Sequence, residues 1–286
     1  MWGDIFMKKA VFFDIDGTLL DSEKGVSKMT SEVKDAIREL QKNDTLVFIA
    51  SGRPYAFLND DILNFGFDGY ILMNGSLILL NDKLDVDNYK SDTSSDSLHM
   101  TPFYKEPFDK KYLKSIIEKF DSLNIEYIVQ DEKYSYIKSE FKHLQSLFTH
   151  VGIPKKYIKN DYNIDDINVY KIEMYCYDDE AIEFCKSLED DNFKYTYFDG
   201  FNLFELYSRK NTKASAILKV LEHFDIDVNN SFAFGDSHND IEMLNTVGCG
   251  IVMDNAINEI KSHADKVTKA VNEDGVAYGI KNYILD

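Results

Sequence analysis

Two aspartates that stand two positions apart, Asp14 and Asp16, are the most informative pair in the sequence. They follow the apolar run Ala10–Phe13 and lead into Gly17 and Thr18. Side chains two apart in an extended segment point the same way, so both carboxylates can face one space. Such a pair is hard to ionise unless a cation neutralises it, and Mg²⁺ favours oxygen ligands. One carboxylate can then attack phosphorus as a nucleophile, while the other protonates the leaving alcohol.

A third aspartate, Asp236, follows another apolar run, Phe232–Phe234, where it can complete the metal site. Catalytic groups of open α/β sheets gather at the carboxyl ends of the strands, so the two aspartate motifs can meet there. Asp240 is interpreted as an acid in the first turn of a helix. His238 is interpreted as a solvent-facing bystander.

The phosphate requires donors and a cation. Ser51 and Gly52 follow the apolar run Leu46–Ala50, and a hydroxyl and an N–H group at the start of a helix can cradle a phosphate. Lys213 opens the helical pattern Ala214–Phe224, where a cation is disfavoured unless it serves an anion. On these grounds alone, the neighbouring Arg209 and Lys210 stay open as alternatives.

The elements that position these residues can be predicted from hydrophobic periodicity. Continuous apolar runs predict five strands that are covered on both faces, and helical patterns lie between them. Strand–helix alternation of this kind indicates a parallel α/β sheet, here a Rossmann-like core domain. The five runs are Ala10–Phe13, Leu46–Ala50, Tyr70–Met73, Phe232–Phe234 and Gly250–Met253.

The middle of the chain has a different pattern. Residues 92–102 are polar and serine-rich, which predicts an exposed loop, and tyrosine-rich strand patterns follow with two helical patterns among them. This succession predicts an α+β domain at residues 84–207, inserted between core segments 1–83 and 208–286.

The net charge of −18 argues against nucleic acid or an anionic membrane as a partner. No apolar run approaches the roughly 20 residues of a membrane span, and the start lacks the apolar stretch of a secretory signal. We therefore expect a cytoplasmic protein that acts on a small metabolite. The sequence makes no prediction of its oligomeric state.

These motifs, in this order, resemble the haloacid dehalogenase-like hydrolase superfamily, and within it the Cof-type (subfamily IIB) phosphatases. The resemblance extends over nearly the whole chain. It rests on the segments 14–20, 51–53, 74–75, 205–213 and 235–244, and on three short motifs near the end, 255–256, 264–265 and 274–277.

The resemblance implies a role for each matching residue. Asp14 is the nucleophile and a Mg²⁺ ligand, and Asp16 is the general acid–base and gives its backbone carbonyl to the metal. Asp236 is the remaining carboxylate on Mg²⁺, with Ser237 nearby. The phosphate is held by Ser51, Gly52, Lys213, Asn239 and the backbone at Ile15, with Thr18 beside them. The inserted domain is implied to be a cap that selects the substrate, and Arg53 and Asn74 are candidates for contacts beyond the phosphate.

Two positions depart from the family pattern. Ala214 and Asp254 stand where the family commonly has glycine. Alanine is the better helix residue, so the first change is expected to be harmless. Asp254 adds a negative charge that the sequence does not explain.

The predicted function is a Mg²⁺-dependent phosphatase that forms an aspartyl phosphate on Asp14 and releases phosphate from a sugar phosphate or similar metabolite. The alternatives are a phosphomutase, which would share this intermediate, and a metabolite-binding protein without turnover. A glycosyltransferase with an Asp-x-Asp metal site is weakest, since it leaves Asp236 and Lys213 unexplained.

Overall fold

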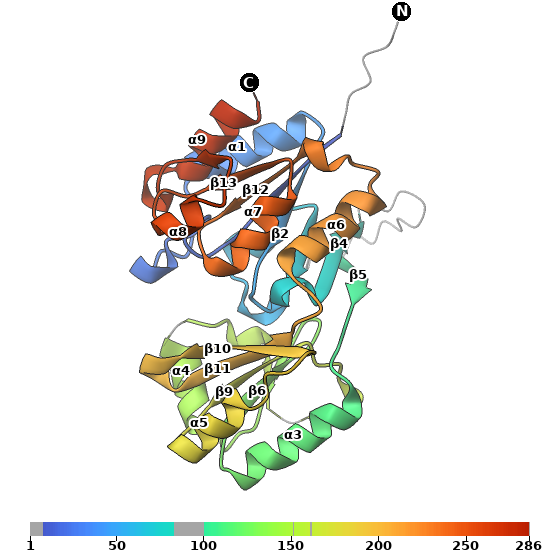
Figure 1. Ribbon diagram of the computed structural model, residues 1–286, viewed down its shortest axis with the longest axis vertical. Helices are drawn as coiled ribbons and strands as arrows, with labels where there is room; N and C mark the ends of the chain where they lie inside the picture. Colours follow the sequence, from blue (N-terminus) through green and yellow to red (C-terminus); the bar gives the residue numbers. More distant parts are fainter. Residues whose placement is uncertain (1–7, 83–99, 151, 161, 286) are drawn as a thin grey trace, which may run out of the picture. The chain divides into compact units, whose positions relative to one another are not determined.

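The computed structural model describes residues 8–82, 100–150, 152–160 and 162–285 (Figure 1). The chain forms two compact units. The core unit comprises Met1–Gly52, Asp60–Phe103 and Thr212–Asp286, and the inserted unit comprises Arg53–Asn59 and Tyr104–Asn211. The sequence-based limits of 84 and 207 stay a prediction.

The core unit is built on one sheet with the strand order β14-β13-β12-β1-β2-β3-β4-β5. The pairs from β14 to β3 are parallel, and β4 runs antiparallel to β3. This confirms the predicted α/β class. The strands are β1 (Lys9–Phe13), β2 (Thr45–Ala50), β3 (Gly69–Leu72), β4 (Leu77–Asn81), β5 (Met100–Lys105), β12 (Ser231–Gly235), β13 (Cys249–Val252) and β14 (Lys266–Val267).

Helices cover both faces of this sheet, which is why its strands are continuously apolar (Figure 1). The chain crosses from β1 to β2 through α1 and, in the opposite direction, from β12 to β13 through α7. Right-handed crossovers in opposite directions place the two helices on opposite faces. The core helices are α1 (Ser31–Lys42), α2 (Asp60–Leu63), α6 (Lys213–His223), α7 (Ile241–Thr246), α8 (Asn258–Lys261) and α9 (Gly275–Tyr283).

The expected loop at 92–102 is only partly tested. Residues 92–99 lie outside the described residues, whereas Met100 begins strand β5, so the prediction is wrong for residues 100–102. Strand β5 lies beside β4 at the edge of the sheet, and this pairing between distant segments has no local signal in the sequence.

The inserted unit has a six-stranded sheet with the order β10-β11-β9-β6-β7-β8, antiparallel except for the pair β7–β8. One face carries an apolar core that includes α3 and α5. Its elements are α3 (Lys110–Ser122), β6 (Glu126–Gln130), β7 (Ser135–Ile137), α4 (Lys142–His150), β8 (Ile158–Lys159), β9 (Lys171–Tyr175), α5 (Asp179–Lys186), β10 (Phe193–Phe198) and β11 (Leu203–Ser208).

Helix α4 is a third helix where the sequence pattern predicted two. Its buried residues Leu144 and Phe148 pack with Ile128 and Ile137 of the sheet. Phe57 joins the same cluster, with its ring centroid 5.3 Å from that of Phe148. This contact helps to explain why the short segment after Gly52 belongs to the inserted unit.

Among the described residues, every helix is too short or too polar to cross a lipid bilayer.

Candidate active site

The turn after β1 brings Asp14 and Asp16 to the carboxyl end of the core sheet. The Ile15 carbonyl accepts hydrogen bonds from the N–H groups of Leu19 and Leu20 at 3.0 and 2.9 Å, which closes the turn. Gly17 has a φ of +77°, and a Cβ atom there would lie 2.1 Å from Oδ2 of Asp236. Glycine is therefore required both by the backbone conformation and by the approach of that carboxylate.

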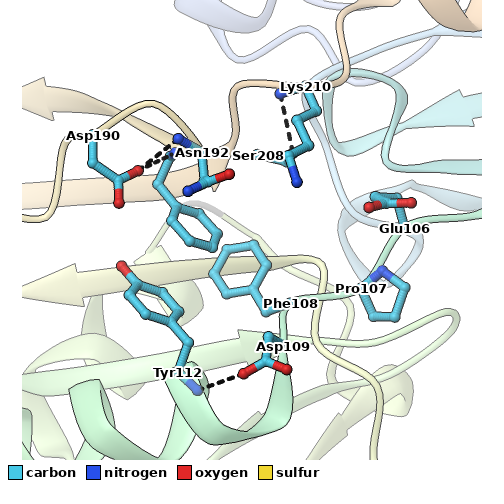
Figure 2. A pocket seen from close by; sticks show the side chains of 10 residues that line it. Glu106, Pro107, Phe108, Asp109, Tyr112, Asp190, Asn192, Ser208 and Lys210 are labelled. Carbon is cyan, nitrogen blue, oxygen red and sulfur yellow. Dashed lines mark hydrogen bonds between the residues drawn. The ribbon is translucent and has the colours of Figure 1, made fainter.

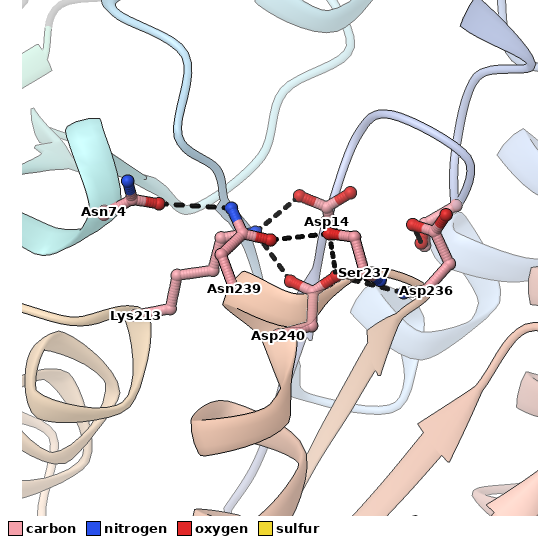
Figure 3. Close-up of polar contacts among 8 residues, drawn as sticks. Asp14, Asn74, Lys213, Asp236, Ser237, Asn239 and Asp240 are labelled. Atoms are coloured by element: carbon pink, nitrogen blue, oxygen red, sulfur yellow. Dashed lines mark hydrogen bonds and ion pairs between the residues drawn. The ribbon is translucent and has the colours of Figure 1, made fainter. Parts of the chain in front are cut away.

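Lys213 lies at the first position of α6, and its side chain is fully buried. Its Nζ atom lies 2.6 Å from Oδ1 of Asp14 and 2.6 Å from Oδ1 of Asp240 (Figure 3). Burial acts to lower the pKa of the lysine, but these two carboxylates outweigh it and raise the pKa above its ordinary value. The lysine is tolerated at a helix N-terminus because it serves two anions.

Asp240 is fully buried and uses both of its oxygens. While Oδ1 contacts Lys213, Oδ2 accepts the N–H groups of Asp236 and Ser237, each at 3.0 Å, and the Ser237 hydroxyl at 3.2 Å. These bonds confirm its interpretation as an acid in a first turn. They also add what the sequence analysis missed, namely that Asp240 holds the ammonium group of Lys213 in place.

The Asp236 carboxylate is oriented by two neighbours. The Thr18 hydroxyl donates to Oδ1 at 3.2 Å, and the Asn255 amide lies 3.5 Å from Oδ2 while donating to the Gly17 carbonyl at 2.9 Å. Burial, and then the charge of Asp240, raise the pKa of Asp236 to about 7. The sequence analysis assigns no role to Asn255, because its contact with the first turn cannot be read from its position in the chain.

The acidic groups around Lys213 fit a divalent cation. Carboxylate oxygens of Asp14, Asp236 and Asp240 lie within 4.8 Å of one another. Because Asp240 is engaged by protein donors, Asp14 and Asp236 are the carboxylates suited to bind a metal. Burial raises the pKa of Asp14 well above its ordinary value although Lys213 lowers it, so one ammonium does not compensate the cluster. Carboxylate oxygens whose negative charge is not compensated are ligands of the kind that Mg²⁺ prefers.

The predicted phosphate-binding loop adjoins this cluster within the core unit. The Asn74 N–H donates to the Ser51 carbonyl at 3.1 Å, and the Asn239 amide donates to Oδ1 of Asn74 at 3.2 Å (Figure 3). A Cβ atom on Gly52 would lie 3.1 Å from Oδ1 of Asn74 and 3.6 Å from Nδ2 of Asn239. Residues from three separate segments therefore converge here. The Ser237 hydroxyl donates to Oδ1 of Asn239 at 2.6 Å and links this group to the acidic cluster.

Three other residues lie outside this arrangement. Arg53 belongs to the inserted unit, where its guanidinium donates to the Phe57 carbonyl at 3.0 Å. The side chain of His238 is 67% exposed, in agreement with its interpretation as a bystander. Asp254 forms an ion pair with Lys261 at 2.7 Å, so its added charge has a local partner.

A family model described as haloacid dehalogenase-like hydrolase matches residues 11–280. The chain is 27% identical over 281 residues to the putative phosphatase YkrA of Bacillus subtilis (strain 168), with 96% of each chain covered. It is equally 27% identical over 281 residues to the 5-amino-6-(5-phospho-D-ribitylamino)uracil phosphatase YwtE of the same organism, with 95% of this chain and 96% of YwtE covered.

Solved structures share the fold. A hypothetical protein from Geobacillus kaustophilus HTA426 superimposes with a TM-score of 0.79 at 26% identity, covering 96% of this chain and 98% of the other. The subclass IIB sugar phosphatase BT4131 superimposes with a TM-score of 0.72 at 23% identity, with the same shares covered.

Proposed function

Since the chain belongs to the haloacid dehalogenase-like hydrolases and is a phosphatase of that family, we propose that it hydrolyses a small phosphorylated metabolite, such as a sugar phosphate, in the cytoplasm. We propose further that the reaction needs Mg²⁺ and passes through an aspartyl phosphate on Asp14. The observation that carries this proposal is the buried contact of Lys213 with Asp14, next to the Asp236 carboxylate.

In the proposed first step, a carboxylate oxygen of Asp14 attacks phosphorus and the bond to the leaving oxygen breaks. Asp16 gives its proton to that oxygen, so the product leaves as an alcohol. In the second step, Asp16 takes a proton from water, the water oxygen attacks phosphorus, and the Asp14 carboxylate is released together with inorganic phosphate.

The remaining residues bind and orient the phosphoryl group. Ser51, Gly52, Asn239 and the backbone at Ile15 are the proposed donors to its oxygens. Lys213 offsets the charge of these oxygens, and a fixed ammonium needs no reorganisation during the reaction. Asp240 is a positioning residue, because it acts through the lysine.

Asp14, Asp236 and the carbonyl of Asp16 would hold Mg²⁺, with Ser237 nearby. Bound Mg²⁺ supplies the positive charge that lets a dianionic phosphate approach this acidic group. The inserted unit is the proposed cap that selects the substrate. Arg53 and Asn74 stay candidates for contacts beyond the phosphate.

The proposal is tested with p-nitrophenyl phosphate and Mg²⁺. We expect Asp14→Asn to release no phosphate above background, whereas Asp265→Asn, a control at an exposed aspartate, keeps the parent activity. Activity of Asp14→Asn equal to that of the parent would end the proposal. Release of inorganic phosphate from a sugar phosphate, rather than its transfer to another hydroxyl, separates a phosphatase from a phosphomutase.

A further inference from the structure

The inserted unit contains a cavity of about 370 Å³ that the proposed reaction does not use (Figure 2). All the residues that line it belong to this unit, and they come from three segments. The first is residues 106–112 around the start of α3, the second is residues 190–193, which lead into β10, and the third is residues 208–210 at the end of β11. Sites for small ligands have volumes of this order, so the cavity can hold a small organic molecule.

Aromatic rings form the apolar part of the cavity. The rings of Tyr112 and Phe193 are stacked, with their centroids 4.4 Å apart and their planes at 5° to each other. Phe108 meets Phe193 edge-on, with centroids 4.7 Å apart. Tyr112 and Phe193 are only partly buried, although they pack against the α3 and α5 core, so part of their aromatic surface lines the cavity. Such surface attracts both methylene groups and the ammonium groups of amines.

A carboxylate is held by the backbone of each residue in the stacked pair. Oδ1 of Asp109, the N-cap of α3, accepts the Tyr112 N–H at 2.9 Å. Oδ1 of Asp190 accepts the Phe193 N–H at 2.8 Å and the Asn192 N–H at 2.7 Å (Figure 2). Among the described residues, none donates a hydrogen bond to Oδ2 of either aspartate. These two oxygens are therefore fixed in place and can accept hydrogen bonds from a ligand.

The lining of the cavity has an excess of negative charge. It contains three carboxylates, those of Glu106, Asp109 and Asp190, and one ammonium, that of Lys210, which gives a net charge of −2 when all four groups are ionised. Burial, and then the charge of Asp190, raise the pKa of Tyr112 to about 12, so the phenol stays neutral and adds no charge. A dication matches this lining, whereas an anion such as a phosphate ester would be repelled by it.

From these contacts we propose that the cavity binds an aliphatic diamine. One ammonium group binds Oδ2 of Asp109, the other binds Oδ2 of Asp190, and the methylene chain lies along the aromatic rings. This inference is independent of the proposed phosphatase function, because every contact in it lies within the inserted unit. The lining begins and ends close in the chain to the limits of this unit, Tyr104 and Asn211, whose side chains share a hydrogen bond of 3.0 Å. A bound diamine is therefore expected to stabilise the segments by which the chain enters and leaves the unit.

Calorimetric titration of putrescine into the parent tests the inference. Mg²⁺ is kept in excess to occupy the active-site carboxylates, and physiological salt screens the attraction of cations to the net charge of −18. The comparison ligands are butylamine, which lacks one ammonium group, and butane-1,4-diol, a neutral molecule of the same chain length. We expect putrescine to bind and to raise the Tm, butylamine to bind at least about tenfold more weakly, and the diol to show no binding.

Two variants test the carboxylates. Asp109→Asn and Asp190→Asn each remove one charge, while the amide oxygen can still accept the backbone N–H groups. Each variant is expected to bind putrescine about as weakly as the parent binds butylamine. Asp178→Asn is the matched control, because Asp178 caps α5 in the same unit by accepting the Ala181 N–H at 2.9 Å and lies outside the cavity. The control should keep the parent's affinity within about twofold.

Weaker binding in either cavity variant, with the control unchanged and the Tm of each free variant showing that it is folded, supports the inference. A parent that does not bind putrescine overturns it, as does a diol that binds as tightly as putrescine. An affinity for putrescine that all three variants share, whether kept or lost, also overturns it, because the cavity carboxylates would then have no part of their own. None of these measurements uses phosphatase activity, so failure here is distinct from failure of the proposed function.

Discussion

The Nζ atom of Lys213 lies 2.6 Å from Oδ1 of Asp14, although the two residues are 199 positions apart in the chain. The ammonium group is held from its other side by Asp240, also at 2.6 Å, and all three side chains are buried. The contact engages one carboxylate oxygen of Asp14, so the other is the proposed nucleophile. A fixed cation at this point offsets negative charge that develops on the phosphoryl group.

Replacement of Lys213 by methionine should therefore affect the chemical step. We expect kcat with p-nitrophenyl phosphate to fall by about 10²- to 10³-fold, the loss typical of a removed electrostatic contact in an active site. Lys210→Met is the matched control, because Lys210 lies three residues earlier in the inserted unit, and it should keep kcat within about threefold. Steady-state kinetics check this. Equal losses in both variants would contradict the assignment of Lys213.

Gly17 offers a test of the metal site that leaves every acidic group in place. In Gly17→Ala, the added Cβ atom would lie 2.1 Å from Oδ2 of Asp236, so that carboxylate must move. We expect kcat/KM to fall at least about tenfold and the Mg²⁺ concentration for half-maximal activity to rise. Gly25→Ala is the control, since Gly25 has a similar φ of +71° with nothing within 4 Å of the new atom. Gly25→Ala should lower the free energy of unfolding by no more than about 1 kcal/mol. A Mg²⁺ requirement in Gly17→Ala like that of Gly25→Ala would count against the metal site.

Removal of divalent cations should abolish activity. The negative charge of the Asp14 and Asp236 carboxylates exceeds the positive charge that Lys213 supplies. A bound cation is therefore expected to stabilise the folded state as well. We predict that EDTA reduces phosphate release to background, that Mg²⁺ restores it, and that Mg²⁺ raises the Tm of the parent. The rise in Tm should be absent in Asp236→Asn. Full activity in EDTA, or the same rise in Tm in Asp236→Asn, would contradict this prediction.

Asp68 gives the core unit a pH-dependent stability that is independent of catalysis. Burial raises the pKa of this carboxyl from 3.8 to about 6, against the hydrogen bond that it accepts from the Val47 N–H at 2.8 Å. Between these pH values the folded state keeps the proton and the unfolded state has lost it. The protonated Asp68 carboxyl therefore contributes its full stabilisation of the folded state below pH 4. As the pH rises to 6, this contribution is lost and the free energy of unfolding falls by up to about 3 kcal/mol. Urea denaturation from pH 4 to 7 should show a smaller decline in the free energy of unfolding in Asp68→Asn than in the parent. If this free energy falls equally with pH in both proteins, Asp68 is ruled out as the cause.

Much of the fold and of the candidate site could be predicted from the sequence, because the signals for them lie in short local segments. Strands covered on both faces have continuous apolar runs, so the segments that lead to Asp14, Ser51 and Asp236 were recognisable. Because carboxyl ends of parallel strands share one edge of a sheet, the convergence of these motifs followed from topology. The family and the enzyme class that the motifs predicted are confirmed by the family match.

The features that were missed depend on contacts between distant segments. The position of Asp240, four residues after Asp236, indicates a first-turn acid but not which lysine it holds. Helix α4 was not predicted because its packing partners lie on a sheet formed by other segments. Likewise, the residues that follow Gly52 show no sign in their own composition that they join the inserted unit.

An aspartyl phosphate on Asp14 can be tested directly by trapping it chemically. The enzyme is mixed with Mg²⁺ and p-nitrophenyl phosphate, quenched, and treated with borohydride, which reduces an aspartyl phosphate to homoserine. Peptide mass spectrometry then locates the change. We predict homoserine at position 14 only when both Mg²⁺ and substrate are present. Reduction at another aspartate, or an unmodified Asp14 in an enzyme that is turning over, would contradict it.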